Sequence, residues 1–159
     1  MSLSHLDDTG RARMVDVGDK PMTARTASAE GAVRMSRTAF EVVQAQAVAK
    51  GDVLAVAQVA GITAAKRTGE LIPLCHPLGL DAIDVQLQLD PALPGVRVTA
   101  TAKVVGRTGV EMEALTAVAV ACLTVYDMVK AVDREMTIEA VRLMTKTGGT
   151  RGDRRRAGE

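Results

Sequence analysis

The segment Leu71–Leu80, with the sequence LIPLCHPLGL, holds residues suited to chemistry in the first half of the chain. His76 stands between Cys75 and Pro77, and nearby prolines restrict the backbone around its imidazole. Two interpretations stay open: a ring that handles protons or orients a substrate, or a core histidine bonded to a backbone carbonyl. For Cys75, beside Leu74, packing is favoured over a nucleophilic role.

A second set of candidates lies near the end of a long helical pattern. Asp127 and Lys130 are three residues apart, and Arg134 follows seven after Asp127, so a helix of that length would carry all three on one face. A carboxylate beside an ammonium group can transfer protons at a substrate. The alternative is a solvated ion pair, which the spacing alone favours. Apolar neighbours such as Val125 and Val129 favour partial burial instead.

Glu113 lies on the same helical pattern, 14 residues before Asp127. At 1.5 Å per residue the two carboxylates are about 21 Å apart along the axis, too far to serve one small reacting centre. Either the substrate is long, or the two groups belong to a site shared between subunits. Thr116, Val120 and Thr124 form a stripe of small residues between them, on which another chain could pack closely.

Several basic residues stand beside glycines or near helix ends, where backbone N–H groups and a cation together can form an anion site. They are Lys50 before Gly51, Lys66, Arg67, Lys130, and Lys146 shortly before Gly148 and Gly149. Neither the P-loop spacing nor the pattern GxGxxG is present, so this signal alone does not identify a nucleotide site.

The hydrophobic pattern predicts the elements that must position these residues. Alternation predicts a turn and short strand around Arg13–Pro21, then strands at Thr23–Met35, Asp81–Leu89, Val96–Val104 and Met136–Lys146, with the Asp81 and Val96 strands joined as a hairpin. Helical spacing predicts helices at Thr38–Ala47, Val53–Arg67 and Glu111–Val132, with Ser36 and Asp52 as N-caps. The fold class is therefore α+β: helices packed on one face of a mainly antiparallel sheet, with the ferredoxin-like arrangement as the nearest common plan.

Composition narrows the class of protein. The chain has 159 residues and a mass of 16.7 kDa, enough for one domain with its own core. Lys and Arg number 20 against 19 acidic residues, which argues against nucleic-acid binding by phosphate neutralisation. The aromatic content of 1% nearly excludes base-stacking platforms. No membrane partner is expected either, because the longest apolar stretch, Ala114–Val125, is too short to cross a bilayer.

The two cysteines, Cys75 and Cys122, have no zinc-binding spacing and fit a reduced, cytoplasmic setting. We therefore expect no protein-bound metal. Residues 1–13 are expected to form a disordered N-terminal tail, residues 14–153 a single domain, and residues 154–159 a basic C-terminal tail.

Seven stretches, in order along the chain, resemble one protein family. They are MVD at 14–16, KGD at 50–52, AGITAAKRT at 60–68, LIPLCHPL at 71–78, TGVEMEALTAV at 108–118, LTVYDMVKAV at 123–132, and 141–149 followed by Gly152 and Asp153. Together they resemble molybdenum cofactor biosynthesis protein C, the family of cyclic pyranopterin monophosphate synthases. LIPLCHPL combined with GVEMEALTA is far more specific than any single motif.

The resemblance implies a phosphorus–oxygen lyase of molybdenum cofactor (molybdopterin) biosynthesis. Such an enzyme converts 3′,8-cyclo-7,8-dihydro-GTP to cyclic pyranopterin monophosphate and releases pyrophosphate. The resemblance implies catalytic roles for Asp127, Lys130 and Lys50. It implies substrate-binding roles for Leu74, Cys75, His76, Met112 and Glu113, with Glu111, Lys66 and Lys146 completing the pocket and Arg67 helping to neutralise the pyrophosphate.

We expect no cofactor of the protein itself, because the sequence has no carboxylate cluster that demands a bound metal, and it stays open whether Mg²⁺ accompanies the substrate triphosphate. The resemblance implies a homohexamer built as a trimer of dimers, with sites at subunit interfaces. Two rival functions stay open on the residues alone. One is a regulatory module of the same fold that binds a small molecule without catalysis, and the other is a nucleotide hydrolase that makes no pterin.

Overall fold

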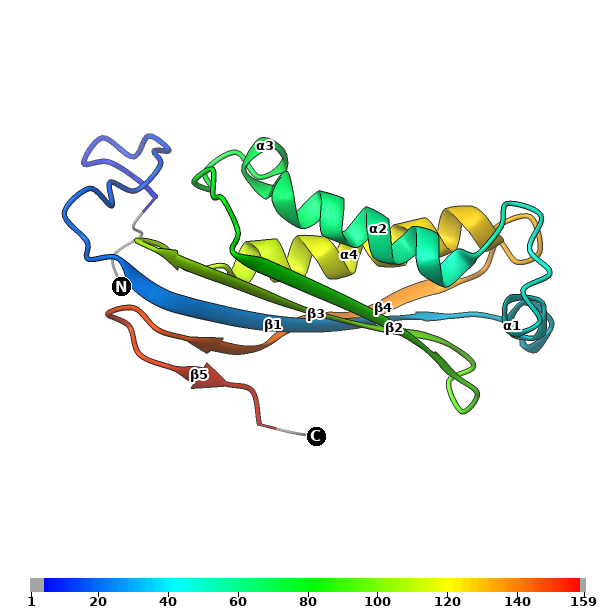
Figure 1. Ribbon diagram of the computed structural model, residues 1–159. Coiled ribbons are helices and arrows are strands. Elements are labelled where there is room, and N and C mark those ends of the chain that lie inside the picture. The colour runs from blue at the N-terminus through cyan, green and yellow to red at the C-terminus, as the bar shows by residue number, and fades with distance from the viewer. Residues whose placement is uncertain (1–4, 158–159) are drawn as a thin grey trace.

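Residues 5–157, the part of the chain that the computed structural model describes, form a five-stranded sheet with helices on one face (Figure 1). The strands are β1 (Thr23–Arg34), β2 (Ala82–Asp90), β3 (Gly95–Gly106), β4 (Thr137–Thr147) and β5 (Arg154–Arg155). The helices are α1 (Arg37–Gln44), α2 (Val53–Lys66), α3 (Thr68–Leu71) and α4 (Glu111–Val129). The strand order is β2-β3-β1-β4-β5, and all neighbours are antiparallel. The predicted α+β class and the ferredoxin-like arrangement are confirmed.

Both predicted N-cap residues, Ser36 and Asp52, cap the helices that follow them, α1 and α2. The Ser36 hydroxyl accepts a hydrogen bond from the backbone N–H of Ala39 at 3.2 Å, and the Asp52 carboxylate accepts one from Ala55 at 3.0 Å. Each cap satisfies an N–H group that the first helical turn leaves without a partner. Because α2 begins directly after Asp52, Lys50 is held at that end of the helical layer.

α4 lies close to α2 and to the sheet because two glycines leave room for it. A Cβ at Gly61 in α2 would come within 2.9 Å of the Ala117 carbonyl oxygen, and one at Gly31 in β1 would come within 2.7 Å of a Val118 methyl group. Small Ala and Val side chains dominate the core between the layers, and Phe40 is the largest fully buried side chain. This packing fixes α4 along the sheet, so its two ends lie at opposite ends of the molecule (Figure 1).

The apolar character of α4 reflects this central position. The 19-residue helix is longer than the stretch Ala114–Val125 and passes a test for a membrane span by length and composition alone, as buried core helices also do. However, 56% of its apolar window is buried inside the chain, against α2, β1, β3 and β4. A helix buried in this way is typical of the core of a globular domain.

The connection after α4 differs from the prediction. The helix ends at Val129 instead of Val132, so it does not reach Arg134, and the condition under which Arg134 would share a helical face with Asp127 is not met. The Asp133 carboxylate explains this end, because it accepts hydrogen bonds from the backbone N–H groups of Ser36 at 2.7 Å and Glu135 at 2.9 Å. These bonds turn the chain towards β4 before another helical turn can form.

Residues 5–13 and 154–156 make backbone pairings, while the division into tails and one domain stays a prediction. Residues 5–13 form a turn closed by a bridge between Leu6 and Ala12, and Arg154–Arg155 pair with β4 as β5. The backbone N–H of Arg156 donates to the Met144 carbonyl at 2.8 Å. Hydrophobic periodicity does not predict backbone hydrogen bonds of this kind, because both segments are polar. Both segments were therefore predicted as tails. The short strand predicted before β1 is an irregular segment, and residues 1–4, 158 and 159 lie outside the described part.

Candidate active site

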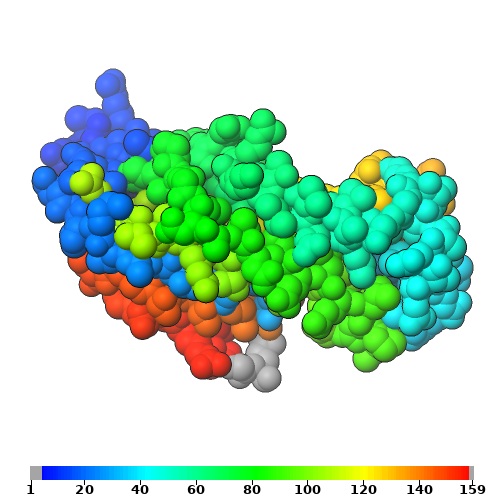
Figure 2. Space-filling view, viewed as in Figure 1, coloured from blue at the N-terminus to red at the C-terminus, as the bar shows by residue number. Residues whose placement is uncertain are grey.

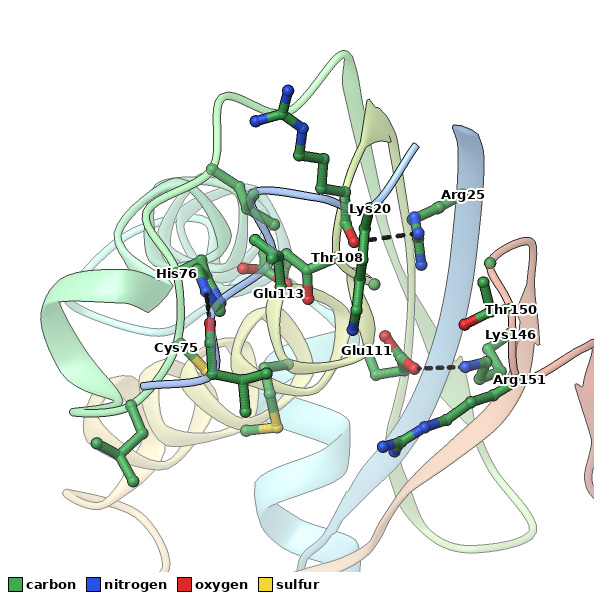
Figure 3. Close-up of a pocket in the computed structure, with 18 of the residues that line it drawn as sticks. Lys20, Arg25, Cys75, His76, Thr108, Glu111, Glu113, Lys146, Thr150 and Arg151 are labelled. Carbon is green, nitrogen blue, oxygen red and sulfur yellow. Dashed lines mark hydrogen bonds and ion pairs between the residues drawn. The ribbon is translucent and has the colours of Figure 1, made fainter. Parts of the chain in front are cut away.

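A pocket of about 340 Å³ opens at the end of the molecule where β1 and α4 begin (Figure 3). Its walls come from the segment before β1, the loop after α3, the β3–α4 connection and the loop after β4. Much of the predicted substrate site meets here. The predicted residues that line the pocket are Leu74, Cys75, His76, Glu111, Met112, Glu113 and Lys146.

His76 joins two walls of this pocket. Its Nε2 lies 2.7 Å from the carbonyl oxygen of Val15, and since a carbonyl only accepts, the ring nitrogen is the donor. The bond links the segment before β1 to the loop after α3, which also lie side by side in Figure 2. The ring thus has the backbone carbonyl partner of the structural interpretation, and it also lines the pocket, while its role towards a substrate stays a prediction.

We expect His76→Ala to lower turnover more than it lowers stability. The variant loses one hydrogen bond, worth about 1 kcal/mol, while Pro73 and Pro77 continue to restrict the loop. Urea unfolding and initial rates at matched folded concentration measure the two effects. A variant that unfolds at much lower urea but turns over normally when folded would leave His76 with a purely structural role.

Two carboxylates lie at the first turn of α4, inside the pocket. Glu111 Oε1 is 3.2 Å from the ammonium nitrogen of Lys146, while Glu113 is only 3% exposed. Burial, with a smaller contribution from the nearby Glu111 charge, raises the pKa of the Glu113 carboxyl. Burial and the charge of Glu113 likewise raise the pKa of the Cys75 thiol, so Cys75 is a neutral thiol rather than a thiolate at neutral pH.

We expect Glu113→Gln to remove a pH-dependent loss of stability. A carboxyl with a raised folded pKa contributes stability that is complete below its unfolded pKa, about 4.3, and that is lost as the pH rises through the folded value. The variant should therefore gain stability relative to the parent between about pH 4 and neutral pH. Urea unfolding across this range measures the difference, and parallel free energies of unfolding for the two proteins would contradict it.

The opposite end of α4 brings together the three predicted catalytic residues. The ammonium nitrogen of Lys50 is 2.7 Å from Oδ2 of Asp127, and that of Lys130 is 2.7 Å from Oδ1. Lys50 also donates to the Asp127 backbone carbonyl at 2.9 Å. All three side chains are about half exposed within the single chain, so the cluster is neither enclosed nor fully solvated. Hydrogen bonds from Lys130 and Lys50 lower the pKa of Asp127 to about 2, so its carboxylate stays ionised at neutral pH.

The pocket and the Lys50–Asp127–Lys130 cluster do not meet within one chain. Glu113 and Asp127 stand 14 residues apart on one continuous helix, which separates them by about 21 Å along its axis, as predicted. Lys66 and Arg67, at the end of α2, do not line the pocket, and Arg67 Nε instead pairs with Glu70 at 3.4 Å.

The expected stripe of small residues on α4 is only partly a free surface. Thr116 is buried, and the Thr124 hydroxyl donates to the Val120 carbonyl at 2.8 Å. The outward row of α4 instead carries apolar side chains, because Leu123 is 57% exposed and Met112 is 36% exposed. α4 therefore exposes single apolar side chains at Met112, which lines the pocket, and at Leu123, towards the cluster.

Sequence reasoning missed four basic residues that line the pocket: Lys20, Arg25, Arg107 and Arg151. A signal for Arg25 was present, because alternation along β1 places it on the inward face with Ala27 and Ala29. A charged residue on a buried strand face requires a special partner. The other three lie in connections, where neither alternation nor helical spacing predicts a direction.

Acidic and sulfur-containing residues do not gather into a metal site in the described structure. Residues 5–157 contain no group of three or more His, Cys, Asp or Glu side chains arranged to hold a metal ion.

Comparison with known proteins identifies relatives that extend over nearly the whole chain. The MoaC family model matches residues 14–149. The cyclic pyranopterin monophosphate synthase of Methylobacterium nodulans is 62% identical over 151 residues, which are 95% of this chain and 94% of that protein. The synthase of the same name from Cereibacter sphaeroides is 59% identical over 150 residues, 94% of each chain. With the family match spanning both the pocket residues and the lysine–aspartate cluster, this chain belongs to the MoaC family.

Proposed function

We infer that this chain is a cyclic pyranopterin monophosphate synthase of molybdenum cofactor biosynthesis. It converts 3′,8-cyclo-7,8-dihydro-GTP to cyclic pyranopterin monophosphate and releases pyrophosphate. The two relatives of that name align with 95% and 94% of the chain. The observation that carries the proposal is the convergence of Lys50 and Lys130 on Asp127, at 2.7 Å each, in a chain with these relatives.

The lysine–aspartate cluster suits the proton transfers of this reaction. Opening and reclosing a purine-derived ring requires protons to be delivered to and removed from several nitrogens and oxygens. Lys50 and Lys130 each carry an ammonium group that can donate a proton, and the ionised Asp127 between them holds both groups in place. A regulatory module that only binds a nucleotide would not require this arrangement.

The pocket suits the phosphate chemistry. A sugar hydroxyl attacks the α-phosphorus and the bond to pyrophosphate breaks, so negative charge on the departing group must be neutralised. Lys146, which lines the pocket and pairs with Glu111 at 3.2 Å, would supply part of this positive charge. Lys66 and Arg67 lie outside the pocket of their own chain. They would help to neutralise the pyrophosphate only if a neighbouring subunit completes the site at this end of the molecule.

We propose that each working site combines the pocket of one chain with the cluster of another. Two copies related by a two-fold axis across the middle of α4 would bring the Asp127 end of one helix to the Glu113 end of the other, twice. Such a partner would cover the exposed apolar side chains of this layer, among them Leu123 on α4 and Val56 and Val59 on α2. It would also bury the half-exposed cluster, where charges act more strongly than in water.

The assembly that we propose is a homohexamer, a trimer of such dimers, in the cytoplasm. We propose no resident cofactor or metal, and any Mg²⁺ would arrive with the substrate triphosphate. The small Ala- and Val-rich core favours association, because a domain of this size gains from burying more surface.

The test is to supply enzymatically prepared 3′,8-cyclo-7,8-dihydro-GTP and to assay two products together. A synthase releases pyrophosphate and forms a product that oxidises to a fluorescent pterin. Pyrophosphate without the pterin would identify a nucleotide hydrolase, and binding without either product would identify a regulatory module. Either of these outcomes would overturn the proposal.

A further inference from the structure

The carboxylate of Asp133 joins the two segments that carry the proposed catalytic lysines. Its Oδ2 accepts a hydrogen bond from the backbone N–H of Ser36 at 2.7 Å, and its Oδ1 accepts one from the backbone N–H of Glu135 at 2.9 Å. Ser36 begins the α1 segment, which leads through α1 to Lys50. Glu135 belongs to the connection between α4 and β4, which begins with Lys130. The two oxygens of one side chain therefore hold these segments together, at the end of the molecule where α1 and the end of α4 lie (Figure 1).

The backbone between α1 and Lys50 is a run of closed turns. The backbone N–H of Ala47 donates to the Val42 carbonyl at 3.0 Å. The backbone N–H of Gly51 donates to the Val48 carbonyl at 3.0 Å, which closes a turn around Lys50. Because closed turns leave the backbone little freedom, the position of α1 determines where the backbone of Lys50 lies.

The connection that begins with Lys130 is attached to α4. The backbone N–H of Lys130 donates to the Tyr126 carbonyl at 2.9 Å, and that of Asp133 donates to the Val129 carbonyl at 3.3 Å. The Tyr126 hydroxyl also donates to the Arg134 carbonyl at 2.9 Å. A displacement of this connection would therefore displace Lys130 with it.

In the part of the chain that the structure describes, two side chains make polar links between the α1 segment and the end of α4. One is Lys50, a long and half-exposed side chain whose ammonium group contacts Asp127. The other is Asp133, a short side chain that accepts from the backbone of Ser36. Apolar side chains of α1 also pack into the core, but the hydrophobic effect has no direction. The Asp133 contact is thus the link that remains when a substrate engages Lys50.

The contacts of Asp133 favour its charged form. Backbone hydrogen bonds from Ser36 and then from Glu135 lower the pKa of its carboxyl, so the carboxylate is ionised at neutral pH. A hydrogen bond to an ionised acceptor is shorter and stronger than one between neutral groups. Asp133 does not line the pocket, so its position suits a residue that acts through other residues.

We propose that Asp133 is a positioning residue, which fixes the backbones that carry Lys50 and Lys130. Both ammonium groups then lie 2.7 Å from the Asp127 carboxylate. Exact placement matters, because a misplacement of about 1 Å that originates far from the chemistry can cost about a hundredfold in rate. The effect on turnover rests on the proposed function, whereas the placement of the lysines is visible without any reaction.

The experiment compares two Asp133 variants with the parent, in steady-state kinetics with the cyclised dihydro-GTP and in crystal structures. Asp133→Ala removes both acceptor oxygens, and Asp133→Asn keeps one of them. Glu135→Ala is the matched control, because it removes one negative charge from the same connection. Its side chain is exposed, and the variant keeps the backbone N–H that donates to Asp133.

We expect Asp133→Ala to lower kcat at least about tenfold and to leave KM within about threefold of the parent, because the pocket lies at the other end of α4. Asp133→Asn should lose less, and Glu135→Ala should keep kcat and KM within about twofold. In the crystal structure of Asp133→Ala, at least one ammonium group of Lys50 and Lys130 should lie beyond about 4 Å from the Asp127 carboxylate. Glu135→Ala should keep both contacts. If Asp133→Ala fails to fold, Asp133→Asn decides both comparisons.

The proposal is wrong if Asp133→Ala keeps the kcat of the parent, if it loses no more than Glu135→Ala, or if its kcat falls while both ammonium groups stay in contact with Asp127. Failure of the proposed function gives a different pattern. In that case the parent forms no pterin, but the lysines still move away from Asp127 in Asp133→Ala and not in Glu135→Ala.

Discussion

Lys130→Ala and Lys50→Ala are each expected to lower turnover by about a hundred- to ten-thousand-fold, the range of a general acid–base group. Both ammonium groups lie 2.7 Å from the Asp127 carboxylate, and neither belongs to the core. Because both side chains are about half exposed, the variants should unfold at nearly the same urea concentration as the parent. Initial rates with the cyclised dihydro-GTP, at matched folded concentration, measure the loss.

Lys103→Ala is the matched control for these lysines. Lys103 is an exposed residue of β3 and takes no part in the pocket or the cluster. It should keep the activity of the parent. A Lys50 or Lys130 variant that reacts as fast as Lys103→Ala would remove that lysine from the mechanism.

Asp127→Asn is expected to lower turnover by at least about a hundredfold. The amide has nearly the shape of the carboxylate but no charge, so the two ammonium groups lose the anion that holds them together. The loss should be similar at every pH near neutrality, because a carboxyl with a pKa of about 2 does not titrate there.

The pH dependence of stability gives an independent check on Asp127. A lowered folded pKa contributes stability that is complete above the unfolded value, about 3.9, and that is lost only as the pH falls through the folded value. The free energies of unfolding of Asp127→Asn and the parent should therefore differ by a constant amount between about pH 5 and pH 8. A difference that changes across this range would show that Asp127 titrates there, contrary to its contacts.

The elements of the fold were predicted correctly where residues close together in the sequence determine the local structure. The hairpin of β2 and β3 was predicted because apolar residues alternate on both sides of a turn at Asp90–Gly95. The starts of α1 and α2 were predicted because Ser36 and Asp52 are capping residues at the right spacing. The end of α4 was predicted three residues late, because the Asp133 contact with Ser36 joins positions 97 residues apart.

The site could be predicted only in parts. Asp127 and Lys130 were placed on one helical face by spacing, but the contact of Lys50 with Asp127 spans 77 residues and came from the family resemblance. The sequence left open whether this pair is solvated or partly buried, since that depends on what packs around the end of α4. Arg25 was missed because the alternation along β1 was used only to predict a strand. It was not used to determine which charged side chain lies on the buried face of that strand.

The predicted site residues lie at the two ends of α4, so we expect each working site to combine the pocket of one chain with the cluster of another. Complementation between two inactive variants tests this composite site most directly. Asp127→Ala and Glu113→Ala chains are unfolded, mixed in equal amounts and refolded together, with each variant refolded alone as the control. A mixed dimer has one site with both residues intact and one with neither, so random pairing should restore about a quarter of the parent activity. Mixed oligomers that are verified by mass spectrometry but stay as inactive as each variant alone would contradict the shared site.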